Sequence, residues 1–517
     1  MCISILEEPT QAKSYAPKRR PHFSLFTTDR SKMMNLTKMV DTLFDAGGVD
    51  EHAALILLSC VGIVGAHLVL SFFFYPAKSR GNSGKVLWPY GSSFGKNAVG
   101  WMMAKIARHR ESKKADLWSL EELESFHKPD VHKFWNESYY WNGCDVKTQD
   151  RVITRLSHRG MHAKKMYVLL IVDTKSHGIL SLEVDDVPVE NAPRKDGVVV
   201  TATGLGISYE CLEPMQKWRI RYKGLLRKGY LDREQVSKGA TLPPLVKGEN
   251  AVHVDLDMVY TNDSATFWYM RDEPTMTLAK NLSQEPWNGR FFQYCLQRSH
   301  NHCHVEAFGR MKGAVVLDNG SKAAKRKYDC GTFRDHSWDL RNWSAIDQLF
   351  ILMVAFKTPL VLNGEEYWYL DITLVHMPGN SNGVQSFTTG YLSGKHGADG
   401  TATGRNEGNL SVHHATAITD IPFQFGKDAE TREPLPTNTV DVEVCPDGGA
   451  RAVLTVQCSG TIRRAMYWPD RGTSVVYEDG MDFSITDPVT GQNVEGYGTR
   501  QNGFRIGEYD PSQGGVG

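Results

Sequence analysis

The chain of 517 residues lacks an excess of charge of either sign, a regular cysteine pattern and the common nucleotide and hydrolase motifs. Its 59 Lys and Arg residues balance 59 Asp and Glu residues, so no global field favours nucleic acid, and we expect no nucleic-acid partner. The nine cysteines form no C-x-x-C pair, which argues against a disulfide framework. No G-x-S-x-G elbow, H-E-x-x-H run or phosphate loop occurs.

Two short patterns resemble cofactor-binding motifs, one for a dinucleotide and one for a metal ion, but the surrounding sequence argues against each. The glycines Gly204 and Gly206 lack the third glycine of a dinucleotide loop, and strand-like residues follow them, which is typical of a bend or bulge. His302 and His304 would share one face of a strand, but no matching ligand cluster lies at a known zinc spacing. We therefore predict no metal and no cofactor.

Long apolar runs are also scarce, with one exception at Ala53–Tyr75. This run holds no Asp, Glu, Lys or Arg and is long enough to cross a hydrocarbon core of about 30 Å. A buried helix of this length would show a polar face, and a cleaved signal would lie nearer the N-terminus. We predict a transmembrane helix over 53–75 after an N-terminal tail over 1–52, with the lipid bilayer as one partner.

The orientation of this predicted helix follows from its flanks. Basic residues are denser after the run, at Lys78, Arg80 and Lys85, which places the C-terminal part in the cytoplasm. N-x-S/T sequons scattered along the chain favour the lumenal side instead and leave that alternative open. We expect a single-pass protein of the endoplasmic reticulum or another endomembrane, with its main domain cytoplasmic.

Residues 76–130 are predicted to form a helical linker. Within residues 96–114, apolar residues recur at helical spacing beside Trp101, and basic residues occupy the other side. Such a helix suits the headgroup layer of a membrane, and it equally suits packing on the following domain. The sequence leaves these two interpretations open.

From about residue 131 the apolar pattern alternates, which predicts short strands. Val252–Met258 alternates apolar and polar residues, and Met166–Val172 with Ile179–Val184 indicates a hairpin. Turn signals recur to Gly507, which is typical of a sandwich or of closed barrels. About 380 residues of this kind exceed one small barrel. We predict a mainly β fold with two units, 131–300 and 301–517.

A dense polar run between predicted strands is the strongest candidate site. It contains Arg334, Asp335, His336 and Ser337 and ends at Trp338. Pairing with Arg334 would keep Asp335 ionised, whereas burial would raise its pKa and make it a proton donor. The imidazole at position 336 could act as acid, base or orienting partner. A structural hydrogen-bond network that joins strands explains the same residues equally well.

This run lies in a stretch that resembles proteins related to carotenoid 1,2-hydratase (hydroxyneurosporene synthase) and the AttH-like group. The resemblance covers about residues 130–510 and rests on two segments, H-x-E-x-x-G-R-x-x-G and G-x-R-D-H-S-W-G-x-R-x-W. The matching residues are His304, Glu306, Gly309, Arg310, Gly313, Gly331, Arg334, Asp335, His336, Ser337, Trp338, Arg341 and Trp343. This chain departs from the pattern at Asp339, where the family usually has glycine, and at Phe333.

The resemblance implies two tandem lipocalin-like antiparallel barrels, the second of which carries the Arg-Asp-His-Ser-Trp motif, and a hydrophobic small-molecule ligand. In the hydratases an acid protonates an isoprenoid C=C bond and water captures the carbocation. Transferred here, Asp335 would be the proton donor, tuned by His336 and Arg334. The remaining roles would be water handling by His304 and Glu306, and binding of the substrate by Trp338, Trp343 and Ser337.

Two functions remain open on the sequence alone. The first is a membrane-anchored enzyme that hydrates, isomerises or cyclises an apolar molecule at a C=C bond. The second is a noncatalytic lipid or pigment carrier of the lipocalin type, in which the polar run is structural. A docking module on a membrane is a third interpretation. The sequence does not determine the substrate or the oligomeric state.

Overall fold

The computed structural model describes most of the chain beyond residue 93. The described residues are 62, 65–66, 94–127, 135–159, 165–194, 197–202, 204–230, 244–284, 303–318, 320, 323–340, 348–376, 387–395, 409–417, 423–425, 432–434, 439–444, 452–470 and 474–505. The chain divides into two units, Met1–Gly65 and Ala66–Gly517, and all helices and strands named below belong to the second.

The apolar run Ala53–Tyr75 lies almost wholly outside the described residues, so its prediction as a membrane span stays a prediction. Within the described part of the chain, no helix has both the length and the apolar character that a bilayer crossing requires.

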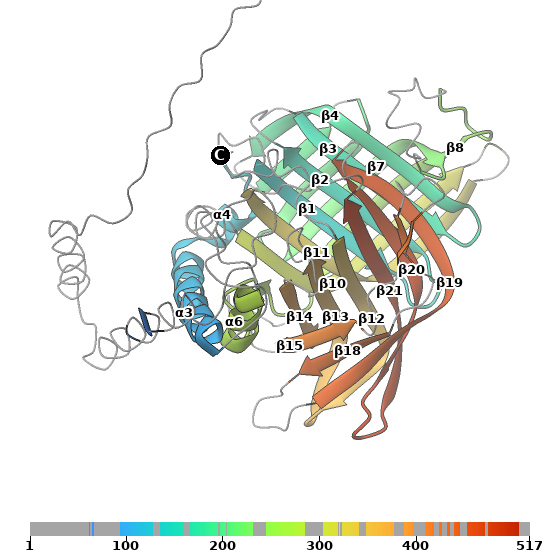
Figure 1. Cartoon of the computed structure of the whole chain (residues 1–517). Coiled ribbons are helices and arrows are strands. Elements are labelled where there is room, and N and C mark those ends of the chain that lie inside the picture. Colours follow the sequence, from blue (N-terminus) through green and yellow to red (C-terminus); the bar gives the residue numbers. More distant parts are fainter. Residues whose placement is uncertain are drawn as a thin grey trace, which may run out of the picture. The chain divides into compact units, whose positions relative to one another are not determined.

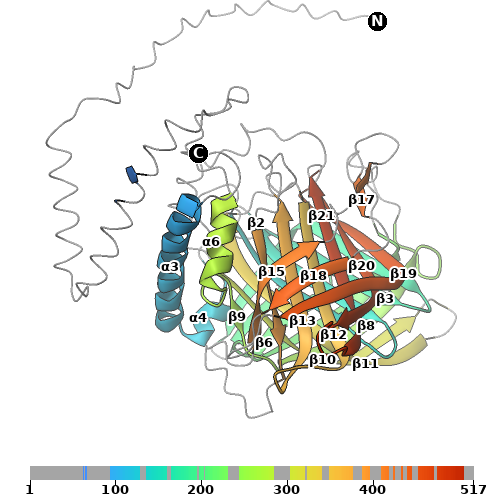
Figure 2. The ribbon, with the colours of Figure 1, turned by 60° about the horizontal axis from the view of Figure 1, so that its bottom comes forward.

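The predicted helix over 96–114 is present as α3 (Phe94–Leu117), followed by the short α4 (Leu120–Glu124). A capping box between Ser119 and Glu122 begins α4. The helix α3 packs along α6 (Thr275–Gln284), which the sequence reading did not predict, as both views show (Figure 1, Figure 2). Arg108 of α3 donates to the hydroxyl of Thr275 at 2.7 Å. Of the two interpretations of this helix, the structure shows packing on the following domain.

The first β unit is an 11-stranded antiparallel sheet. Because β10 pairs with both β8 and β11, and β11 pairs with β1, the order of pairing returns to its start. Its strands are β1 (Trp135–Cys144), β2 (Arg151–Arg159), β3 (Lys165–Thr174), β4 (Gly178–Arg194), β5 (Gly197–Ala202), β6 (Ile207–Glu213), β7 (Lys217–Lys228), β8 (Ala251–Asn262), β9 (Phe267–Trp268), β10 (Cys303–Asp318) and β11 (Ala323–Leu340).

The second β unit is a closed antiparallel barrel in the order β12-β13-β14-β15-β18-β19-β20-β21. Its strands are β12 (Gln348–Leu362), β13 (Glu365–His376), β14 (Phe387–Ser393), β15 (Asn409–Ala417), β18 (Thr439–Val444), β19 (Ala452–Asp470), β20 (Ser474–Thr486) and β21 (Asn493–Arg505). A separate pair of strands is formed by β16 (Phe423–Phe425) and β17 (Arg432–Pro434).

The mainly β fold with two tandem units is therefore confirmed, whereas the boundary expected near residue 300 is wrong. β10 and β11 lie beside β1 and β8 in the first sheet, and the second unit begins only at β12 (Figure 1). The Arg-Asp-His-Ser-Trp motif on β11 thus belongs to the first unit. The error arises because pairing of β11 with β1 joins residues far apart in sequence, which local periodicity does not report.

Three apolar clusters organise the interior. One fills the first sheet around Trp141 and Trp218, and a second fills the closed barrel around Phe350 and Leu370. The third lies between the two β units, the first sheet and the closed barrel. It contains residues of both, among them Tyr140, Phe308, Phe333, Tyr369 and Tyr391. The rings of Phe308 on β10 and Tyr369 on β13 stack with centroids 4.8 Å apart. This interface positions the candidate site described next.

Candidate functional site

The strand β11 distributes the polar motif over two faces of the sheet. Successive side chains of a strand point to opposite sides, so Asp335 and His336 cannot share one site. Asp335 is opposite Tyr140 of β1, a residue of the cluster between the units, and His336 is opposite Tyr139, a residue of the core of the first sheet. The expectation that His336 tunes Asp335 directly is therefore not supported by the geometry.

On the face between the units, Asp335 meets His304 and Glu306 of β10. The Nε2 atom of His304 lies 3.1 Å from Oδ1 of Asp335 and 3.1 Å from Oε1 of Glu306. The hydroxyl of Tyr269 donates to the same Glu306 oxygen at 2.8 Å, and its ring stacks on His304 at a centroid distance of 3.9 Å. The resemblance grouped Asp335, His304 and Glu306, and the fold brings these three together.

Two further carboxyl groups complete what we call the acid cluster (His304, Glu306, Asp335, Asp371 and Glu273). Asp371 projects from β13 of the second unit and is fully buried, and neither of its carboxyl oxygens has a hydrogen-bond partner among the described residues. Glu273, just before α6, is also buried, and its Oε2 accepts the backbone N–H of Met270 at 2.9 Å. The acid cluster thus draws residues from both units.

Burial sets the protonation of this cluster. Burial raises the pKa of Glu273 to about 7, and burial followed by the charges of Glu306 and Asp335 raises the pKa of Asp371 well above its usual range. The pKa of Glu306 is also raised, because burial outweighs the stabilising contact with His304. Burial alone would lower the pKa of His304, but the two neighbouring carboxylates overcome it and raise that pKa to about 9. The cluster therefore retains protons at neutral pH.

The accessible side of the acid cluster is formed by His304 and Asp335. Their side chains are 30% and 16% exposed, whereas that of Glu306 is 4% exposed and Asp371 is fully buried. The rings of Phe267 and Tyr391 stack at 4.4 Å near these residues in the cluster between the units. The arrangement can hold a proton beside an aromatic wall and present it on one side.

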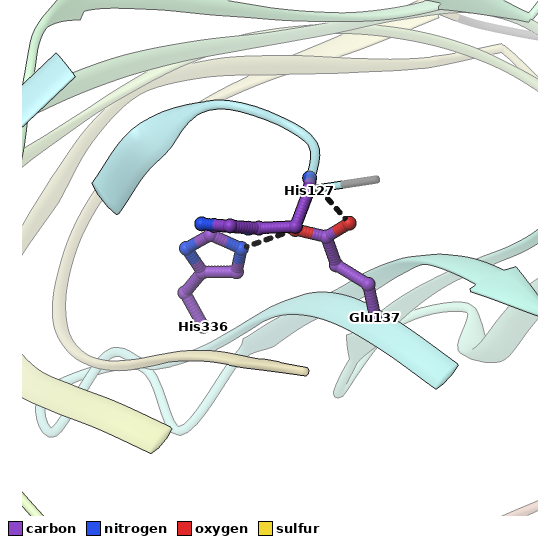
Figure 3. A group of neighbouring side chains, drawn as sticks. All are labelled: His127, Glu137 and His336. Carbon is purple, nitrogen blue, oxygen red and sulfur yellow. Dashed lines mark hydrogen bonds and ion pairs between the residues drawn. The ribbon is translucent and has the colours of Figure 1, made fainter. Parts of the chain in front are cut away.

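On the opposite face of β11, His336 forms a His–Glu–His triad with Glu137 of β1 and His127, which follows α4 (Figure 3). Oε1 of Glu137 lies 2.8 Å from Nδ1 of His127 and 3.2 Å from Nε2 of His336. The other carboxylate oxygen accepts the backbone N–H of His127 at 2.9 Å. One carboxylate oxygen therefore faces two imidazole rings at once.

Aromatic rings fix the orientation of both imidazoles. His127 stacks on Trp338 at 3.5 Å, and His336 stacks on Tyr139 at 3.8 Å. Burial lowers the pKa of His336, whereas for Glu137 burial is outweighed by the two histidines, which lower its pKa. At neutral pH the triad holds a carboxylate and, at position 336, a neutral imidazole.

Arg334 also points to this second face and has a partner that the sequence did not indicate. Its Nη2 lies 2.5 Å from Oε1 of Glu124 on α4. Glu124 further accepts the indole N–H of Trp218 at 2.8 Å and the backbone N–H of Met215 at 3.1 Å. Of the two alternatives for Asp335, the structure does not show pairing with Arg334, because alternation along β11 sends the two side chains to opposite sides.

The remaining predicted site residues lie at different places. Ser337 is buried on the Asp335 face, with its hydroxyl 3.5 Å from Oδ2 of Asp335. Trp338 is fully buried on the His336 face between His127 and Trp118. Trp343 lies outside the described residues. The expected joint binding of one substrate by Ser337 and Trp338 does not fit their opposite faces.

One family model matches a part of the chain that is slightly shorter than half of it. Residues 121–364 match the family model described as "Domain of unknown function (DUF7064)". That span contains all of β11 and ends just before β13. No curated protein matches the chain.

Among solved structures, the chain is similar to CghA crystallised with Sch210972, at 8% identity and a TM-score of 0.43, with 74% of this chain and 94% of that chain covered. A putative AttH from Nitrosomonas europaea shows 7% identity and a TM-score of 0.40, with the same coverage of 74% and 94%. The resemblance to the hydratases in particular stays a prediction.

Proposed function

We propose that this protein is an acid–base enzyme that protonates an apolar small molecule at a C=C bond, leading to hydration, isomerisation or cyclisation. The acid cluster is the observation that carries the proposal. Burial raises the pKa of Glu273, Glu306 and Asp371, so protons are held beside Asp335 at neutral pH, as general acid catalysis requires. The apolar and aromatic surroundings favour an apolar substrate over a charged one.

The chemistry follows from the accessible side of the cluster. Asp335, which reaches solvent beside His304, delivers a proton to one carbon of the double bond, and the π electrons form the new C–H bond. The carbocation left on the other carbon is stabilised by the aromatic faces of Phe267 and Tyr391. Water adds to the cation and then loses a proton, or a neighbouring C–H loses its proton directly. In a cyclisation, a second double bond attacks the cation, and the new cation that this forms loses a proton. In each case one proton returns to the cluster through His304 and Glu306, so the enzyme is regenerated.

Deuterium incorporation tests this proposal directly. The full chain is incubated in D₂O with a panel of farnesol, geranylgeraniol and retinol, and products are analysed by mass spectrometry. Protonation by the cluster leaves a non-exchangeable C–D bond in the product. We expect Asp335→Asn to reduce turnover by about 100-fold or more, the usual contribution of a general acid.

A matched control is Glu478→Gln, which removes another buried carboxyl group with a pKa raised to about 7 outside the acid cluster. It should leave turnover within a few-fold of wild type. Recovery of an unmodified lipid bound to the protein, with no deuterated product, would instead support a carrier.

We further propose that Ala53–Tyr75 anchors the protein in an endomembrane and delivers substrate from the bilayer, with the main domain in the cytoplasm. A variant lacking residues 1–93 keeps α3, which packs on α6, and should fold. It should act normally on detergent-dissolved substrate but weakly on substrate in vesicles. Equal activity on both would mean that residues 53–75 only target the protein to the membrane and do not deliver substrate. Protease protection in sealed microsomes tests the orientation of the main domain.

A further inference from the structure

We propose that the His–Glu–His triad (His127, Glu137 and His336) binds a divalent transition metal ion of the zinc type. The proposal is independent of the acid cluster, because the triad lies on the other face of β11. Figure 3 shows the two imidazoles directed at one carboxylate, with His127 arriving from the segment after α4. Two histidines and one carboxylate are a ligand set that zinc and related ions use in proteins.

The spacing of the three donor atoms fits a common metal ion. Zinc binds nitrogen and oxygen ligands at about 2.0–2.2 Å, so two ligands of one ion lie roughly 2.9–3.4 Å apart. Oε1 of Glu137 lies 2.8 Å and 3.2 Å from the histidine nitrogens, and the three donor atoms all lie within 4.8 Å of one another. His127 lies outside any helix or strand, so its ring can shift slightly. A small shift suffices to bring all three donor atoms within binding distance of one ion.

The surroundings hold these side chains in the form and orientation that binding requires. The imidazoles are fixed by stacking on Trp338 and Tyr139, and the backbone N–H of His127 holds the second oxygen of Glu137. Such outer contacts orient metal ligands in known sites. Each histidine must present an unprotonated ring nitrogen to the ion, so metal binding should be weaker at acidic pH.

Access and open coordination follow from burial. The side chains of Glu137 and His336 are fully buried, whereas that of His127 is 15% exposed, so an ion enters past His127. Three protein ligands leave at least one position of the ion for water or a substrate atom. A bound ion would also tie the segment after α4 to β1 and β11, and so it should stabilise the fold by mass action.

Metal titration of the full chain tests the proposal. The protein is purified with a tag that contains no histidine, stripped with a chelator and titrated with Zn²⁺ by calorimetry, and with Co²⁺ by its visible d–d absorption. We expect one equivalent bound with a micromolar or lower Kd and an upward shift of the melting temperature. His127→Gln and Glu137→Gln should each weaken binding at least tenfold and abolish that shift.

Two controls make the outcome decisive. His177→Gln removes a partly exposed histidine in the turn between β3 and β4, and it should bind like wild type. His304→Gln removes the histidine of the acid cluster and should also bind like wild type. If Glu137→Gln fails to fold, His127→Gln carries the test, because its side chain is partly exposed. No binding by wild type, binding unchanged in His127→Gln, or binding lost only in His304→Gln would overturn the proposal.

Discussion

Asp335 and His336 are consecutive on β11, yet they take part in two separate side-chain networks. Asp335 lies 3.1 Å from Nε2 of His304 on the face between the two β units. His336 lies 3.2 Å from Glu137 within the first sheet. A motif that looks like one constellation in the sequence thus supplies a proton-holding cluster on one side and a histidine–carboxylate triad on the other.

This separation predicts that the two residues act independently. Because their side chains lie on opposite faces of β11, the destabilisations by Asp335→Asn and His336→Asn should add to within about 0.5 kcal/mol. Asp335→Asn and His304→Gln, which remove contacting groups, should instead show a coupling of about 0.5–3 kcal/mol. Urea unfolding of the full chain in one detergent measures both cycles. A coupling between positions 335 and 336 as large as that between 335 and 304 would contradict the assignment to two networks.

A second prediction concerns the buried ion pair between Arg334 and Glu124. Replacing Arg334 by Met leaves the Glu124 carboxylate buried without its cation, which costs about 3–5 kcal/mol in the free energy of unfolding. The double variant Arg334→Met, Glu124→Gln removes the uncompensated charge and should recover much of that loss. Turnover of the refolded double variant then distinguishes a structural role of Arg334 from a role in tuning Asp335. If Arg334 tuned Asp335 directly, the double variant would be stable but inactive.

The strands and the hairpins between consecutive strands were predictable from local patterns, but the pairing of strands far apart in the sequence was not. The two apolar runs and the turn between them predicted a hairpin, and β3 and β4 form it, with Thr174 opposite Gly178. The assignment of β11 to the first sheet depends on its pairing with β1, where Trp141 is opposite Arg334. No local feature of either strand encodes that long-range pairing, so the unit boundary was misplaced.

The candidate site was predictable in part for the same reason. His304, Glu306 and Asp335 come from neighbouring positions of one β-hairpin, and a sequence motif can contain all three. Asp371 and Glu124 come from distant elements and carry no motif, so only the fold reveals them. One signal was available and missed: the period of two along a strand already places Asp335 and Arg334 on opposite faces.

A third prediction concerns the close contact between the two β units at Gly331. A Cβ added at this glycine would lie 2.6 Å from the Cβ of Ala355 on β12, which real structures do not tolerate. Gly331→Ala should therefore destabilise the protein by about 1–3 kcal/mol through overpacking. Adding Ala355→Gly removes the opposing methyl group and should restore most of the stability. Failure of the second change to rescue would show that Gly331 is required for another reason, such as its fit against Tyr369 at 3.4 Å.

A fourth prediction concerns pH and rests on Glu478 of β20, which lies outside both candidate sites. This carboxyl group is fully buried, and it accepts hydrogen bonds from Gln501 at 2.6 Å and from Tyr140 at 3.1 Å. Burial raises its pKa from 4.5 to about 7. The folded state therefore binds this proton more tightly than the unfolded state. The resulting stability is complete below pH 4.5 and is lost as the pH rises through 7.

Glu478→Gln keeps an acceptor for both hydrogen bonds and removes the titration. The stability of wild type relative to this variant should fall by on the order of 2–3 kcal/mol between pH 5 and pH 8, because wild type alone must ionise a buried group. Urea unfolding at each pH measures the difference, with Glu495→Gln on the exposed surface of β21 as the control that should show no such fall. A difference that does not change with pH would mean that Glu478 ionises as readily in the folded protein as in the unfolded chain, and burial would then not be what keeps it protonated.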